Sequence, residues 1–184
     1  MKRRTLIVGA AGLAALGATG WFAFKESARK APQANREARR TPVEPDPAVF
    51  FKAAFDELNG DVVQMESLRG QPLVINFWAT WCPPCVKEMP ELDRISEEMP
   101  NARVIGVAID SRDNVVKFLD KVPVKFPIYI AGHAGIEVTR GLGNNVMALP
   151  FTILINDRGE LVSKVLGEVD PASLRTDISR MLAG

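Results

Sequence analysis

The only two cysteines of this 184-residue chain, Cys82 and Cys85, stand three positions apart, with Pro83 and Pro84 between them. If this segment opens a helix, positions i and i+3 share one face, so the two sulfurs can bond to each other. A thiol at a helix N-terminus lies near unpaired N–H groups and the positive end of the helix dipole, which favour the thiolate. We therefore expect Cys82 to be the exposed nucleophile and Cys85, one turn deeper, to resolve a mixed disulfide.

Other uses of the two cysteines fit the sequence less well. A structural staple that closes so short a loop gains only about 2 kcal/mol by the chain-entropy estimate. A zinc site needs four ligands or close to it, and the chain offers two cysteines and one histidine, His133. A haem attachment site needs a histidine directly after the second cysteine, where this chain has Val86. Two inert core thiols remain an alternative, although the flanking prolines favour a specific turn. We expect redox chemistry and no metal site.

The two prolines also limit how strongly the thiolate is stabilised. Pro83 and Pro84 have no backbone N–H, so the Cys85 amide is the first backbone donor available to the Cys82 sulfur within the motif. We therefore expect a reducing rather than a strongly oxidising couple.

The elements around the motif alternate between strand and helix patterns. Residues 73–79 form a nearly continuous apolar run just before the motif, which is typical of a buried central strand. Residues 102–109 form the next buried strand. Between these runs, apolar residues recur at helical spacing: Val86, Met89, Leu92, Ile95 and Met99. This order predicts two parallel strands joined by a helical crossover.

Two hairpins and two further helices complete the prediction. Asn59-Gly60 favours a tight turn in an N-terminal β-hairpin of residues 51–58 and 61–65. Asp170 is expected to cap a final helix with Pro171 at its first position. The other predicted elements are a hairpin of residues 151–155 and 161–166 and a helix over residues 113–122. Together they give an α/β sandwich with a mixed central sheet flanked by helices.

The chain is divided into three parts by composition. Residues 5–24 are uncharged, follow three basic residues, and are long enough to cross a bilayer as a helix. We expect an uncleaved membrane anchor in residues 1–24; a removed signal peptide is the second choice and a buried core helix a weaker one. Residues 25–47 are charged and contain prolines, which predicts a flexible linker. Residues 48–184 form the predicted domain.

The charge pattern bears on location and partners. Residues 25–41 carry a net charge of +4, so the positive-inside rule does not set the orientation. We expect the domain on the extracytoplasmic, periplasmic side of a bacterial cytoplasmic membrane, because an anchored redox domain serves an oxidising compartment. From Val43 onward the chain has 14 basic and 20 acidic residues, a net charge of −6. Nucleic-acid binding is therefore not expected, because it needs a basic surface. We expect a monomer.

Residues 76–85, Asn-Phe-Trp-Ala-Thr-Trp-Cys-Pro-Pro-Cys, with Glu88 following, resemble the active-site segment of the thioredoxin superfamily. The resemblance is strongest to the membrane-tethered TlpA/ResA-like reductases linked to cytochrome c maturation, and it spans about residues 51–182. It implies a thioredoxin-like fold and a thiol–disulfide oxidoreductase that needs no cofactor beyond its redox-active Cys82–Cys85 disulfide. The implied partners are extracytoplasmic proteins with disulfides, such as apocytochrome c, and a membrane electron donor.

The same resemblance suggests residues that bind the substrate. Pro150 would be a cis-proline facing the cysteine pair, although an ordinary trans proline at a strand edge is the alternative. The backbone of Leu149 would pair with a substrate segment in the manner of a β-strand. Trp81 and Pro83 border the cysteines and complete the expected substrate-binding set.

Glu88 is the third candidate catalytic residue, after the two cysteines. Cytosolic thioredoxin has a buried aspartate where this chain has Asn76, and Glu88 matches the acid of the tethered subgroup. One helical turn separates Glu88 from Cys85. We expect partial burial to raise its pKa and the carboxyl group to handle the proton when Cys85 attacks. A solvated glutamate near a helix N-terminus is the alternative.

Other functions for the same fold stay open. Net disulfide oxidation or isomerisation would use the same residues at a different reduction potential. A tethered thioredoxin-fold binding module would use the fold without turnover. A peroxidase fits less well, because Ala79 stands where such enzymes typically carry a threonine. His133 lies in a glycine-containing stretch that we interpret as a surface loop.

Overall fold

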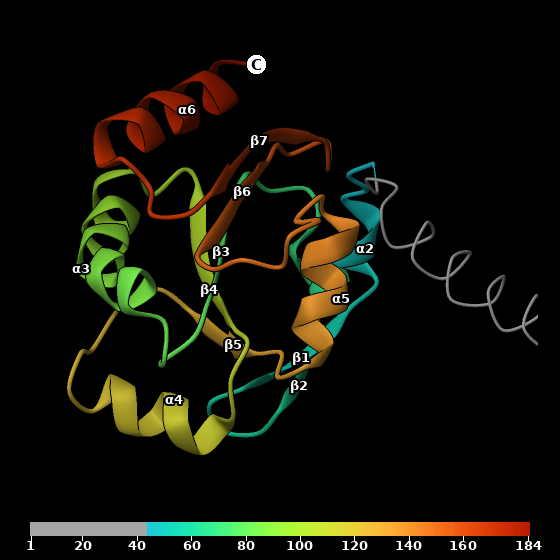
Figure 1. Cartoon of the computed structure of the whole chain (residues 1–184). Coiled ribbons are helices and arrows are strands. Elements are labelled where there is room, and N and C mark those ends of the chain that lie inside the picture. Colours follow the sequence, from blue (N-terminus) through green and yellow to red (C-terminus); the bar gives the residue numbers. More distant parts are fainter. Residues whose placement is uncertain (1–43) are drawn as a thin grey trace, which may run out of the picture. The chain divides into compact units, whose positions relative to one another are not determined.

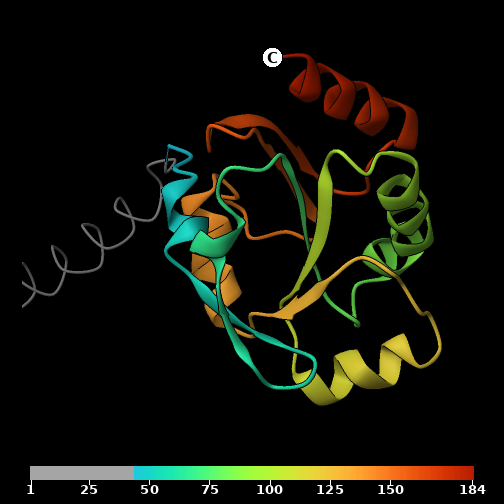
Figure 2. The ribbon, with the colours of Figure 1, turned by 180° about the vertical axis from the view of Figure 1, so that it is seen from behind.

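The computed structural model describes residues 44–184, and Figures 1 and 2 show it from opposite sides. The predicted anchor at residues 5–24 and residues 25–43 of the predicted linker lie outside this range. Within residues 44–184, none of the helices has the length and apolarity that a membrane span requires.

The apolar run before the motif forms β3 (Leu73–Trp78), and all six of its residues are buried. Strand β4 (Arg103–Ala108) pairs with β3 in parallel on one side, and β6 (Phe151–Ile155) pairs with it antiparallel on the other. The sheet is mixed, and its order is β2-β1-β5-β4-β3-β6-β7. The remaining strands are β1 (Ala54–Glu57), β2 (Val62–Gln64), β5 (Ile128–Ile130) and β7 (Leu161–Leu166).

Helices cover both faces of this sheet, which explains why β3 is apolar along its whole length. Successive side chains of a strand point to opposite faces. Val74 accordingly joins one apolar cluster, while Ile75 and Phe77 join the other. The first cluster takes side chains from α3 (Pro83–Glu98), α4 (Arg112–Leu119) and α6 (Pro171–Ala183); the second from α2 (Ala48–Phe51), the 3-10 helix η1 (Met65–Leu68) and α5 (Ala134–Gly141). Figure 1 shows α3 and α6 on the left of β3, and α2 and α5 on its right.

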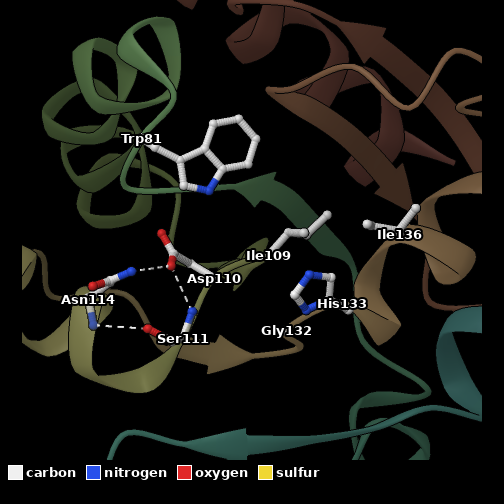
Figure 3. A pocket seen from close by; sticks show the side chains of 8 residues that line it. All are labelled: Trp81, Ile109, Asp110, Ser111, Asn114, Gly132, His133 and Ile136. Carbon is white, nitrogen blue, oxygen red and sulfur yellow. Dashed lines mark hydrogen bonds between the residues drawn. The ribbon is translucent and has the colours of Figure 1, made fainter.

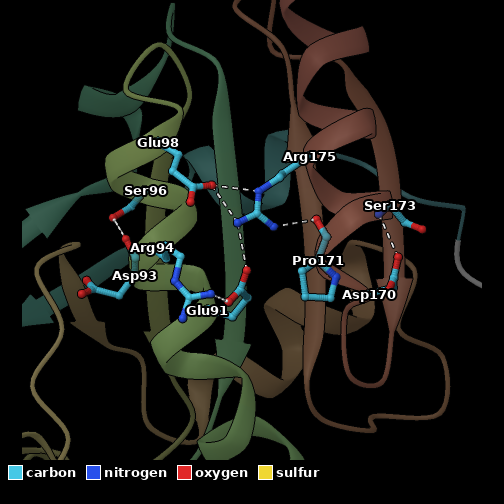
Figure 4. Close-up of polar contacts among 9 residues, drawn as sticks. All are labelled: Glu91, Asp93, Arg94, Ser96, Glu98, Asp170, Pro171, Ser173 and Arg175. Carbon is cyan, nitrogen blue, oxygen red and sulfur yellow. Dashed lines mark hydrogen bonds and ion pairs between the residues drawn. The ribbon is translucent and has the colours of Figure 1, made fainter.

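A charged link joins α6 to α3. The guanidinium of Arg175 pairs with Glu91 at 2.9 Å and with Glu98 at 2.7 Å, as Figure 4 shows. At the start of α6, the side chain of Asp170 accepts a hydrogen bond from the Ser173 N–H, which confirms the predicted cap. Exposed ion pairs add little stability, so the apolar side chains of α6 contribute more to its attachment.

Most predicted elements are present, with shifted ends at the N-terminal side. The hairpin turns at Gly60, whose φ of 100° suits glycine. Its first strand starts only at Ala54, because Phe50 and Phe51 belong to α2. The fold already includes the last residues of the predicted linker, since the Asp46 N–H donates to the Gly141 carbonyl at 2.9 Å.

His133 is exposed and lies in a turn, as expected, but the helix α5 that begins directly after it was not predicted. Two glycines, Gly132 and Gly135, give the stretch the composition of a turn. Burial of Val138 and Leu142 in the second cluster stabilises the helix despite the low helix propensity of glycine, since tertiary packing routinely overrides propensity. Strand β5 was also missed, because three residues are too few to show a period.

Candidate active site

The two cysteines form a disulfide at the start of α3. Cys82 occupies the N-cap position and Cys85 lies in the first turn, with an S–S distance of 2.11 Å and a Cα–Cα distance of 5.3 Å. The Cys85 N–H donates to the Cys82 sulfur at 3.4 Å, as expected from the two prolines. The sequence therefore predicted both the pairing and the local hydrogen bond correctly.

The expectation of an exposed Cys82 needs correction. Cys82 is 4% exposed and Cys85 is 0% exposed, so the order is as predicted, but the disulfide is almost entirely covered. The reason is packing: both cysteines belong to the apolar cluster between the sheet and α3. Only a narrow edge of the Cys82 residue meets solvent in this oxidised state.

The loop between β3 and α3 is fixed by hydrogen bonds to the end of β4. The backbone N–H and the hydroxyl of Thr80 donate to Oδ2 of Asp110, at 3.1 and 2.5 Å. Oδ1 of Asp110 accepts from the Ser111 N–H at 2.7 Å and from Nδ2 of Asn114 at 2.8 Å. Partial burial alone would raise the pKa of Asp110, but these hydrogen bonds outweigh it and hold the pKa below its ordinary value.

Glu88 is buried beside the first turn of α3 and is 3% exposed. Its Oε1 accepts a hydrogen bond from Nδ2 of Asn76 at 2.7 Å, and its Oε2 accepts from the Val169 N–H at 3.0 Å. Desolvation raises the pKa of Glu88, the two hydrogen bonds lower it, and the charge of Glu168 raises it further, so the net direction is upward. The predicted direction of the shift and its cause are confirmed, and the solvated alternative is excluded.

Asn76 links Glu88 to the sheet. It lies on β3 opposite Thr152 of β6, and its Nδ2 donates to the Thr152 hydroxyl at 2.9 Å as well as to Glu88. Its Oδ1 is buried without a hydrogen-bond partner. The Asn76 amide nitrogen thus donates to two oxygens, which holds Oε1 of Glu88 beside β3.

The expected substrate-binding residues differ in exposure. The Leu149–Pro150 peptide bond is cis, which confirms the prediction from the resemblance. Leu149 is partly buried against both apolar clusters. Trp81 is 66% exposed and Pro83 is exposed, so both can contact an incoming polypeptide. That Pro150 faces the cysteine pair stays a prediction.

A pocket of about 470 Å³ opens beside the motif, and Figure 3 shows its eight lining residues. They come from the loop before α3, from the end of β4 with the start of α4, and from the start of α5: Trp81, Ile109, Asp110, Ser111, Asn114, Gly132, His133 and Ile136. Asp110 was not among the predicted site residues. A signal was present, because Asp110 directly follows a buried strand predicted to run parallel to β3, and parallel strands end at the same edge.

In residues 44–184, the His, Cys, Asp and Glu side chains form no group of three or more that could hold a metal ion.

The buried Glu88 should make stability depend on pH. Because its folded-state pKa is raised, the folded protein keeps this proton to a higher pH than the unfolded chain. The stability that Glu88 contributes is complete below its ordinary value of 4.5 and is lost as pH rises through the raised value. Glu88→Gln cannot ionise, so the unfolding free energy of the wild type minus that of the variant should fall as pH rises from 4.5 through the raised pKa.

Urea denaturation of the oxidised protein at several pH values measures this difference. Glu44→Gln, at an exposed position, is the matched control and should give a difference that changes little with pH. A pH-independent difference for Glu88→Gln would contradict the assigned burial.

Comparisons with known proteins agree with this geometry. The Redoxin family matches residues 29–181. The chain is 34% identical over 110 residues to "Thiol-disulfide oxidoreductase ResA" of Halalkalibacterium halodurans, which covers 58% of this chain and 60% of that protein. It is 28% identical over 149 residues to "Thioredoxin-like protein YneN" of Bacillus subtilis, covering 78% and 79% of the two chains.

A solved structure, a thioredoxin-related protein from Neisseria meningitidis serogroup B, superposes with a TM-score of 0.63 at 29% identity, covering 71% of this chain and 99% of that one. The alignments span about 60% of the length of the first ResA relatives. The fold, the paired cysteines and the family match over most of the sequence lead to one conclusion: the chain belongs to the Redoxin family of the thioredoxin superfamily and is similar to ResA-type thiol–disulfide oxidoreductases.

Proposed function

We propose that this protein is a thiol–disulfide oxidoreductase that reduces disulfides of other proteins through Cys82 and Cys85. The observation that carries the proposal is the disulfide at the N-terminus of α3, with Cys82 at the N-cap and Cys85 one turn later. The similarity to proteins named thiol–disulfide oxidoreductases supports it.

The reaction runs in two exchange steps. The Cys82 thiolate attacks one sulfur of the substrate disulfide, which forms a mixed disulfide and releases the other substrate sulfur as a thiolate. Cys85 loses its proton and attacks the Cys82 sulfur, which releases the second substrate thiolate. The substrate has then gained two electrons, and the Cys82–Cys85 pair is oxidised. A dithiol donor, held at the membrane, would reduce the pair again.

Glu88 handles the proton in the second step. Its buried carboxylate, held by Asn76 and the Val169 N–H, lies one helical turn beyond Cys85 and has a raised pKa. A base whose pKa is raised toward neutrality accepts a thiol proton more readily than an ordinary glutamate. Ionising Cys85 at this moment makes its attack possible, since the thiolate is the nucleophile.

The substrates are proteins with accessible disulfides, and apocytochrome c is the specific candidate. Trp81, Pro83, Leu149 and Pro150 form the contact surface, in which the Leu149 backbone pairs with an extended substrate segment. The place of action is the extracytoplasmic side of a bacterial cytoplasmic membrane, to which residues 5–24 attach the domain.

Cysteine variants test the proposed activity directly. Cys82→Ala should abolish disulfide reduction, because the attacking sulfur is gone. Cys85→Ser should accumulate substrate bound covalently through Cys82, because nothing resolves the mixed disulfide. Non-reducing gels followed by mass spectrometry measure the adduct, with the double variant as control. If Cys82→Ala instead loses disulfide reduction but keeps its biological activity in cells, the protein is a binding module without turnover.

The reduction potential tests the direction of electron flow. With two prolines limiting the donors to the Cys82 sulfur, we expect a potential well below that of strong periplasmic oxidants, which is about −120 mV. Equilibration with glutathione redox buffers measures it. A value near that of the oxidants would favour net disulfide formation by the same residues.

The role of Glu88 is tested by the pH profile of exchange. Glu88→Gln should slow the resolving step about 100-fold near neutral pH, the lower end of what a positioned base contributes. It should also remove the inflection that the raised pKa gives to the wild-type profile. Stopped-flow kinetics of mixed-disulfide resolution measure both, with Glu44→Gln as control. An unchanged profile would exclude Glu88 from the mechanism.

A further inference from the structure

The pocket beside Trp81 contains a combination of groups that the exchange mechanism does not use. Trp81 lines the pocket and immediately precedes Cys82, so the pocket lies within reach of a polypeptide joined to Cys82. One part of the pocket is the exposed indole of Trp81, and other parts are the aliphatic side chains of Ile109 and Ile136. Figure 3 shows Trp81 on the side of Asp110, away from His133 and Ile136.

The pocket contains one carboxyl group. Asp110 is the only acidic residue among the eight that line it, His133 is the only basic one, and none of these eight, all within the described range, is a lysine or an arginine. The hydrogen bonds from Thr80, Ser111 and Asn114 stabilise the ionised carboxylate, so Asp110 stays negative. Four donors use about all the lone-pair positions of a carboxylate. Asp110 therefore offers a fixed negative charge rather than an open acceptor.

We propose that this pocket binds a basic side chain of the substrate polypeptide close to the cysteine that Cys82 attacks, with arginine preferred. A guanidinium stacks on an indole face and is only weakly hydrated, so it leaves water at lower cost than an ammonium group. Its aliphatic stem can lie along Ile109 and Ile136. The negative charge of Asp110, within residues 43–184 of net charge −6, attracts the cation and would repel an acidic residue at the same position.

This inference rests on the proposed function and adds a substrate class to it. The residues that exchange electrons would accept many disulfides, because backbone pairing at Leu149 reads little of the side chains. A charged pocket next to Cys82 would give the enzyme a preference that the sulfur chemistry alone does not supply.

The test uses disulfide-bonded peptides that differ at one position near the attacked cysteine. This position carries arginine, its uncharged isostere citrulline, or glutamate. In separate peptide series it lies one, two or three residues before or after the attacked cysteine. The reduced full-length protein is mixed with each peptide, and the second-order rate constant of exchange is measured. At one position at least, the arginine peptide should react about threefold to fivefold faster than the citrulline peptide. The glutamate peptide should be slowest, and salt at about 0.5 M should shrink the differences.

Variants identify the pocket as the origin of this preference. Asp110→Asn should remove most of the preference, whereas Asp113→Asn, which deletes a charge from an exposed position of α4 that does not line the pocket, should leave it unchanged. Asp110 also holds the Thr80 loop, so a second pair of variants avoids that residue. Ile136→Glu should increase the preference for arginine, and Ile136→Lys should reverse it in favour of glutamate.

The outcomes separate the two proposals. Equal rates for the three peptides at every position, or a preference that Asp110→Asn and Ile136→Lys leave unchanged, would overturn the pocket assignment while the reductase activity stands. Failure to reduce any of the peptides would overturn the proposed activity as well.

Discussion

The parallel pairing of β3 with β4 is the constraint on which the active site depends. Parallel neighbours end at the same edge of a sheet, so the loop after Trp78 and the loop after Ala108 emerge side by side. This brings Thr80 within hydrogen-bonding distance of Asp110 and lets the Ile109 N–H donate to the Trp78 carbonyl at 2.8 Å. A one-residue slip of β3 would move every side chain to the opposite face, which would exchange the residues of the two apolar clusters and separate Asn76 from Glu88. The position of Cys82 at the start of α3 is therefore set by the sheet.

The network around Glu88 joins three parts of the chain that are distant in sequence. The carboxyl group comes from α3. It accepts hydrogen bonds from Asn76 on β3 and from the Val169 N–H just before α6. A buried carboxylate without a cation is costly unless hydrogen bonds compensate. Here two compensate in part, and the remaining cost appears as the raised pKa. The Oδ1 atom of Asn76 is also buried without a hydrogen-bond partner, whereas most buried polar groups in proteins have one.

The sequence determined the parts of the fold that carry a long periodic pattern or a strong local signal. Residues 73–79 and 102–109 were found because strands buried on both faces are apolar throughout, and α6 because Asp170 and Pro171 mark its start. Strand β5 is too short for a period, and α5 is held by packing rather than by propensity. The cis bond before Pro150 followed only from the family resemblance, since about 5–6% of X–Pro bonds are cis. The hydrogen bond from the Val169 N–H to Glu88 could not be predicted, because almost every residue type has a backbone N–H.

Two carboxyl groups near the motif have pKa values that move in opposite directions, and this separation suits two different tasks. Glu88 is desolvated with two donors, so its pKa rises, which suits the proton transfer proposed for it. Asp110 is only partly buried and accepts four hydrogen bonds, so its pKa falls and its charge persists. Such divergence between neighbouring acids is how one fold obtains both a proton carrier and a permanent charge. If the two environments were exchanged, Asp110 would be neutral over a wider pH range, and Glu88 would lose the raised pKa on which its proposed role depends. The division of roles therefore follows from where the sheet and α3 place each carboxyl group, not from the chemistry of the group itself.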